Sequence, residues 1–172
     1  MYRIVEKDML RFILLLTASL TATADDDTDF GKCFAALQLS RPCCKEAAKG
    51  TSLMSDEIKE CKMMPQIPGS CDKSLCFGTK LGLARADGTI YMDKFKKYFE
   101  EKLVDRKDVL EALNKKCYDD KYKLYGEPDE CDLNKMGNCL GWQYLYNCPE
   151  FSDDEECKEI KNIAAKCQKL DL

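Results

Sequence analysis

The chain contains no histidine among its 172 residues. Without histidine, neither Ser-His-Asp nor Cys-His catalysis is available, and most catalytic zinc sites are excluded as well. Paired carboxylates remain, but the sequence places no two of them in an apolar setting that would separate their pKa values. We therefore expect a protein that is not an enzyme and that uses neither a cofactor nor a metal ion.

The sequence also lacks the alternation of Val, Ile and Thr with polar residues that is typical of β-strands. Apolar residues recur instead at helical spacing along nearly the whole chain. This pattern predicts an all-α fold, a compact bundle of about six to eight short helices.

The sequence also lacks any block of charge of one sign. Its 27 basic and 31 acidic side chains are interspersed along the chain. A nucleic-acid-binding surface normally needs clustered Lys and Arg. We therefore expect no nucleic-acid partner.

The first 24 residues have the layout of a secretory signal peptide. Basic residues precede an apolar run of about thirteen residues that ends in the small residues Ala22 and Ala24. A membrane-spanning helix needs roughly 20 apolar residues, so cleavage is the preferred interpretation and an uncleaved anchor the alternative. We predict a signal peptide at residues 1–24 and one secreted, extracellular domain at residues 25–172.

What the predicted mature chain has in abundance is cysteine. An even number of cysteines in an exported chain predicts a disulfide framework, here of up to six bonds. Cys43 and Cys44 are adjacent, and we expect each to join a different element because a bond between neighbours would be strained. The twelve are Cys33, Cys43, Cys44, Cys61, Cys71, Cys76, Cys117, Cys131, Cys139, Cys148, Cys157 and Cys167.

Several helices are predicted from periodicity and end signals. Residues 70–84 read as a central helix, and a second helix with Thr89 as its cap carries one apolar stripe. Further helices are expected at 105–118 and 134–147, separated by a long loop at 119–129. A C-terminal helical extension, 152–172, should begin with a capping box between Ser152 and Glu155. Most of the eight tyrosines, several of them beside lysines, are expected to form a solvated rim.

The cysteine spacing resembles that of insect odorant-binding proteins, in particular the cysteine-rich "Plus-C" subclass. The resemblance rests on Cys71 and Cys76, a gap of 40 residues to Cys117, and the motif Cys139-x8-Cys148 followed by Pro149. It extends to the extra cysteines Cys131, Cys157 and Cys167 and to the text CFGTKLGLARADGTIYMDKF. Four residues separate Cys71 from Cys76, where the family usually has three.

The resemblance implies three interlocked disulfides: Cys44 (or Cys43) to Cys76, Cys71 to Cys139, and Cys117 to Cys148. The partners of the other six cysteines stay open. The resemblance also implies an apolar cavity and a carrier that transports odorants or other semiochemicals through aqueous fluid. A membrane receptor, such as an odorant receptor, would be an indirect partner, and the oligomeric state stays open.

Ten apolar and aromatic residues are candidates for contact with a small hydrophobic ligand. The segment Leu140–Tyr146 holds three aromatic side chains, which favours an aromatic wall that would orient a ligand through tyrosine hydroxyls. Plain core packing is the alternative for each of these residues. Two further functions stay open: a non-olfactory carrier of lipids or hormones, and a secreted interaction module without a cavity. The candidates are Phe77, Leu81, Met92, Phe95, Phe99, Leu103, Leu113, Leu140, Trp142 and Tyr144.

Overall fold

The computed structural model describes residues 33, 36–37, 43–45, 58–65, 67 and 69–168. The predicted signal peptide lies outside these residues. The described part contains six α-helices and one 3-10 helix, and its only β-type pairings are two isolated bridges, so the all-α prediction is confirmed. The helices are α4 (Lys59–Met63), α5 (Asp72–Lys80), α6 (Met92–Lys102), α7 (Lys107–Lys116), η3 (Lys121–Leu124), α8 (Asp132–Tyr146) and α9 (Glu155–Gln168).

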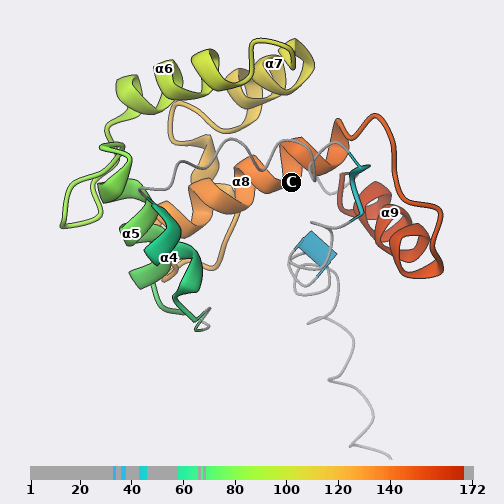
Figure 1. The fold of residues 1–172 in the computed structure, drawn as a ribbon, viewed down its shortest axis with the longest axis horizontal. Helices are drawn as coiled ribbons and strands as arrows, with labels where there is room; N and C mark the ends of the chain where they lie inside the picture. Colours follow the sequence, from blue (N-terminus) through green and yellow to red (C-terminus); the bar gives the residue numbers. More distant parts are fainter. Residues whose placement is uncertain are drawn as a thin grey trace, which may run out of the picture.

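Helix α8 is the centre of the molecule (Figure 1). Helices α6 and α7 lie along one side of it, α4 and α5 lie near its N-terminal end, and α9 lies near its C-terminal end. Buried residues occur around most of the α8 surface, among them Leu133, Met136, Trp142 and Leu145. A helix that is apolar on most sides belongs inside a bundle, which is where α8 lies.

Helix α5 ends before residue 84, where the sequence placed its end. Gly82 adopts a left-handed conformation with φ of 66°. The backbone N–H of Leu83 then donates to the carbonyl of Gly78 over 2.8 Å, a bond that closes the helix end. Ala84 pairs instead with Ile90 in an isolated antiparallel bridge.

Gly78 allows α5 to approach α8 closely. A Cβ atom at this position would lie 3.0 Å from the Cβ of Ala84 and 3.3 Å from Cδ2 of Leu133. Close packing is therefore the role of this glycine.

The predicted loop at 119–129 contains η3, and the tyrosines there are not a solvated rim. Tyr122 and Tyr125 are 4% and 1% exposed, and Tyr118 just before them is also buried. The hydroxyl of Tyr122 donates to Asp132 over 3.0 Å, and Gln143 Nε2 donates to the hydroxyl of Tyr125 over 3.3 Å. The tyrosine prediction was wrong here because η3 packs directly on α8.

The start of α9 also differs from the prediction. The side chain of Asp154, and not that of Ser152, accepts the backbone N–H of Cys157 over 2.9 Å. Asp154 is thus the N-cap residue, whereas the capping-box pattern predicted Ser152. The hydroxyl of Ser152 donates to Asp154 instead.

All twelve cysteines form disulfides, and the six bonds cross-link the bundle. The three pairs implied by the family resemblance are not the ones formed. Cys117 follows α7 where that helix reaches the middle of α8, so it meets Cys139 and leaves Cys148 for another partner. The bonds are Cys33–Cys167, Cys43–Cys157, Cys44–Cys148, Cys61–Cys76, Cys71–Cys131 and Cys117–Cys139.

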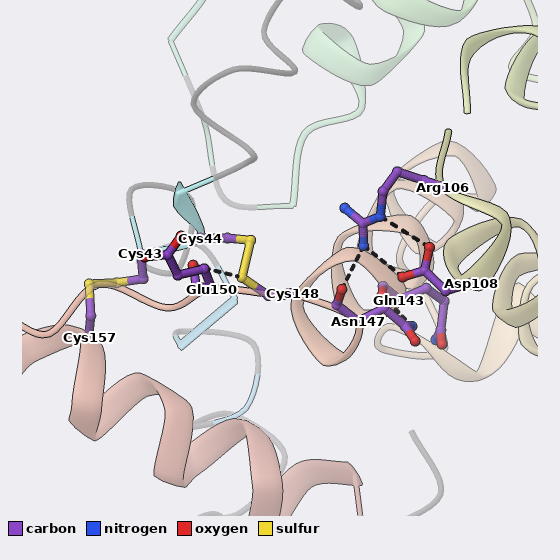
Figure 2. The surroundings of a disulfide bond; sticks show 9 residues. All are labelled: Cys43, Cys44, Arg106, Asp108, Gln143, Asn147, Cys148, Glu150 and Cys157. Atoms are coloured by element: carbon purple, nitrogen blue, oxygen red, sulfur yellow. Dashed lines mark hydrogen bonds and ion pairs between the residues drawn. A yellow bond between two sulfur atoms is a disulfide. The ribbon is translucent and has the colours of Figure 1, made fainter. Parts of the chain in front are cut away.

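The adjacent cysteines Cys43 and Cys44 join different elements, as expected. Cys43 is bonded to Cys157 on α9, and Cys44 is bonded to Cys148 just after α8 (Figure 2). An antiparallel bridge between Cys44 and Phe151 supports the same junction. The chain around Cys43 and Cys44 therefore fastens the C-terminal extension to the end of α8.

Candidate functional site

The apolar stripe of α6 faces the interior of the bundle, as its spacing predicted. Phe95 is 5% exposed, and its ring lies 4.9 Å from the ring of Phe99 and edge-on to Tyr118 at 6.5 Å. Leu103, the residue that caps the helix, is buried as well. We call the side chains of Phe95, Phe99, Leu103, Tyr118 and Tyr144 the α6 layer.

Tyr144 belongs to this layer because its hydroxyl interacts electrostatically with Tyr98 on α6 and with Arg106 at the start of α7. Its side chain is half-buried and packs against the main hydrophobic core. Leu140 lies one helical turn before Tyr144 on α8 and packs against the same core. The α6 layer therefore joins α6, the end of α7 and one face of α8.

Nine of the ten candidate ligand residues lie in one hydrophobic core cluster or pack against it. Phe77 on α5 does not belong to that cluster. The nine are Leu81, Met92, Phe95, Phe99, Leu103, Leu113, Leu140, Trp142 and Tyr144.

Trp142 and Tyr144 do not form one wall. Residues two apart on a helix point about 200° apart, so the two side chains leave α8 on opposite sides. Trp142 has no exposed surface and stacks on Tyr146 with a centroid distance of 5.1 Å. The aromatic side chains of α8 therefore lie in two separate environments. Trp142 and Tyr146 pack on one side of the helix, and only Tyr144 faces the α6 layer.

Four buried polar atoms have no hydrogen-bond partner in the described structure: the hydroxyls of Tyr118, Tyr144 and Tyr146 and Nε1 of Trp142. An unpaired buried donor costs about 1–3 kcal/mol, so such groups need an explanation. Burial raises the pKa of both Tyr118 and Tyr144 to about 12 and also raises the pKa of Tyr146. All three hydroxyls consequently keep their protons at neutral pH.

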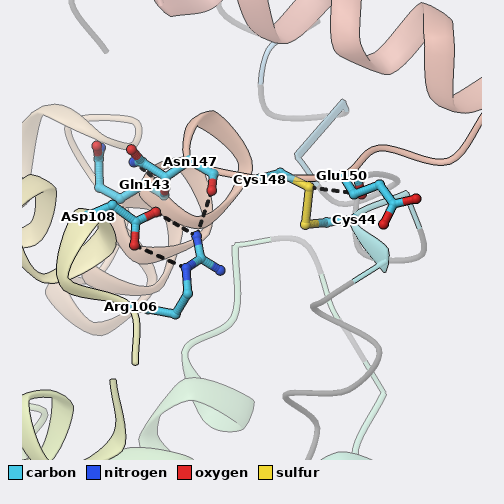
Figure 3. Close-up of polar contacts among 7 residues, drawn as sticks. All are labelled: Cys44, Arg106, Asp108, Gln143, Asn147, Cys148 and Glu150. Atoms are coloured by element: carbon cyan, nitrogen blue, oxygen red, sulfur yellow. Dashed lines mark hydrogen bonds and ion pairs between the residues drawn. A yellow bond between two sulfur atoms is a disulfide. The ribbon is translucent and has the colours of Figure 1, made fainter. Parts of the chain in front are cut away.

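A polar clamp borders the α6 layer at the start of α7. Arg106 donates through Nε and Nη2 to the two carboxylate oxygens of Asp108 over 3.1 and 2.9 Å. The same Nη2 donates to the backbone carbonyl of Asn147 over 2.6 Å (Figure 3). The hydrogen bonds from Arg106 hold the pKa of Asp108 below its ordinary value.

The clamp fixes the start of α7 to the end of α8. Arg106 is the N-cap residue of α7, Asn147 is the C-cap residue of α8, and the next residue is Cys148, which is bonded to Cys44. Figure 3 shows the clamp and this disulfide on the same stretch of chain. No local sequence pattern indicates this contact, because 41 residues separate Arg106 from Asn147.

Two surface pockets lie elsewhere, along α5. Their volumes are about 450 and 320 Å³, and Leu75 and Ala86 line both of them. Neither is lined by any of the ten candidate ligand residues. Two exposed apolar side chains lie nearby: Met63, the last residue of α4, is 81% exposed, and Ile67, between α4 and α5, is 53% exposed.

Among the described residues, no group of three His, Cys, Asp or Glu side chains is placed to hold a metal ion. In the same part of the chain, no helix has both the length and the apolar character that crossing a membrane requires.

Comparison with known proteins adds no relative: no family model, no curated protein and no solved structure matches this chain. The family resemblance therefore rests on the cysteine spacing and on the short sequence match quoted above.

Proposed function

We propose that the protein is a secreted carrier that binds small hydrophobic molecules and transports them through aqueous fluid without chemical change. The observation that carries this proposal is the α6 layer, an apolar and aromatic surface beneath a helix that no disulfide anchors. The resemblance to odorant-binding proteins suggests odorants or other semiochemicals as cargo.

The positions of the disulfides support entry of a ligand beneath α6. The other five described α-helices carry a cysteine within the helix or at a cap, whereas α6 and its caps Tyr91 and Leu103 carry none. Helix α6 is tied to the turn after α7 by an exposed ion pair between Lys96 and Asp119 at 3.4 Å. Exposed ion pairs contribute about 0–1 kcal/mol, so they hold the helix only weakly.

A ligand would replace the contacts that α6 loses when it moves. Apolar area removed from water stabilises a complex by about 25 cal/mol per Å². The disulfide framework would keep the remaining helices in place during this exchange. Opening beneath α6 therefore need not unfold the bundle.

Secretion is part of the proposal. Six disulfides fit an oxidising compartment, because cytosolic thiols are kept reduced. The signal-peptide pattern of residues 1–24 points the same way.

The test is titration of the oxidised mature protein with a hydrophobic fluorescent probe such as N-phenylnaphthylamine. We expect reversible binding with a Kd near 1 μM, about −8 kcal/mol. Phe99→Ala should weaken binding about tenfold, and Val104→Ala is the matched control because Val104 follows the same helix but is 62% exposed. Thermal unfolding of both variants would verify that they remain folded.

Absence of probe binding would contradict the carrier function, and so would equal effects of the two substitutions. Carriage of lipids or hormones outside olfaction would use the same layer. The tissue in which the protein is made distinguishes that function from olfaction.

A second candidate function is a secreted interaction module. It is favoured by the two pockets along α5 and by the exposed apolar side chains of Met63 and Ile67. A protein partner, not a small ligand, would then cover this surface. Failure of all small probes, together with a loss of partner binding in Ile67→Asp, would favour this function.

A further inference from the structure

The two unpaired hydroxyls of the α6 layer restrict the chemistry of its ligand. Tyr118 lies edge-on to Phe95 of α6, and its hydroxyl interacts electrostatically with Glu100 on the same helix. Tyr144 reaches the layer from α8 and interacts with Tyr98 of α6. Both hydroxyl oxygens are buried and without a partner among the described residues. The two hydroxyls thus come from different elements, and each interacts with a side chain of α6.

Neither hydroxyl donates to the polar groups of the neighbouring clamp. The carboxylate of Asp108 accepts from Nε and Nη2 of Arg106, and the carbonyl of Asn147 accepts from the same guanidinium group. The nearby Tyr122 hydroxyl has its own acceptor in Asp132. Burial raises the pKa of Tyr118 and of Tyr144 to about 12, so each hydroxyl has a proton to donate.

A pure hydrocarbon placed beneath α6 would leave both donors unpaired, and the cost of burying them would remain. An oxygen acceptor within an otherwise apolar ligand would remove that cost at the moment of binding. The gain would appear only in the complex, so it would contribute directly to affinity and to selectivity.

We infer that the α6 layer takes apolar ligands that carry a hydrogen-bond-accepting oxygen, such as ketones, aldehydes or esters, and that the hydroxyl of Tyr118 or of Tyr144 donates to it. This inference rests on the proposed carrier function and names its ligand class. Tyr146 and Trp142 are not part of the site, because they stack on each other and leave α8 on the side opposite to Tyr144.

The experiment compares a long-chain methyl ketone with the alkane of the same carbon count in displacing N-phenylnaphthylamine from the oxidised mature protein. The ketone should bind about fivefold more tightly than the alkane, the difference expected from one neutral hydrogen bond. At least one of Tyr144→Phe and Tyr118→Phe should reduce this preference, and the double variant should reduce it as well. Tyr146→Phe is the matched control, since it removes an equally buried and unpaired hydroxyl on the other side of α8 and should leave the preference intact.

Each other outcome has a definite meaning. If the probe does not bind, the proposed carrier function is wrong, and the inferred ligand class is wrong as well. If probe and alkane bind but the ketone has no advantage, the carrier function stands and the ligand class is wrong. The ligand class is also overturned if neither Tyr118→Phe nor Tyr144→Phe reduces the preference, or if Tyr146→Phe reduces it as much as they do.

Discussion

At the scale of single residues, the main feature is the contrast between tyrosines that are paired and tyrosines that are not. Tyr122 donates to Asp132, and Tyr125 accepts from Gln143, so these two buried hydroxyls are satisfied. Tyr118 and Tyr144 are buried without a partner in the described structure. The free protein therefore carries a cost at these two positions that a ligand is proposed to remove.

We predict that Tyr118→Phe and Tyr144→Phe each raise the free energy of unfolding of the unliganded protein by about 1 kcal/mol, because each removes an unpaired buried donor and keeps the ring. Denaturant unfolding followed by circular dichroism measures this change. The control is Tyr122→Phe, which should lower the free energy of unfolding by about 1 kcal/mol, since it leaves Asp132 without its donor. A destabilising effect of Tyr144→Phe would mean that its hydroxyl has a partner in the free protein.

At the scale of elements, the helices differ in how they are held. Helix α9 lies at the edge of the molecule but carries both Cys157 and Cys167. Helix α6 also lies at the edge and depends on the apolar contacts of its inner face (Figure 1). Helix α9 is thus attached to the molecule covalently, whereas α6 is attached only by non-covalent contacts.

We predict that the backbone amides of α6 exchange with deuterium at least about tenfold faster than those of α9, because α6 can open locally without breaking a covalent bond. Mass spectrometry of the exchanging oxidised protein would measure both helices in one experiment. Addition of a bound ligand should slow exchange in α6 and leave α9 unchanged. Equal protection of α6 and α9 in the free protein would contradict the proposed entry beneath α6.

At the scale of the whole molecule, the absence of histidine decides the response to acid. No side chain with a reference pKa near 6.5 is present, and carboxylates titrate near 4. The pKa of Asp108 is lowered by its hydrogen bonds to Arg106. A lowered folded-state pKa contributes stability above the unfolded pKa, and this stability is lost as the pH falls through the folded value. The clamp next to the α6 layer is therefore intact at neutral and mildly acidic pH.

We predict that ligand affinity changes by no more than about threefold, less than 1 kcal/mol, between pH 7.5 and pH 6, and falls only below about pH 5. Probe titrations at several pH values measure the affinity. In Asp108→Asn the loss at low pH should be smaller, because residue 108 no longer titrates. A tenfold loss of affinity completed between pH 7 and pH 6 would contradict the prediction.

The sequence by itself determined the helical class, the six disulfides and the buried stripe of α6. Each of these follows from local information: apolar spacing within one helix, and an even number of cysteines in a chain with a signal-peptide pattern. The separation of Trp142 from Tyr144 also follows from helical geometry, although three aromatics in one short segment suggested a single wall.

Only the tertiary structure decided which cysteines pair, which tyrosines are buried and where polar groups meet. Cys117 pairs with Cys139 because the end of α7 packs on the middle of α8, and Tyr125 is buried because η3 returns the chain onto that helix. Arg106 binds the carbonyl of Asn147 across 41 residues of chain. Such contacts depend on the packing of whole helices against one another, and a local pattern in the sequence carries no record of that packing.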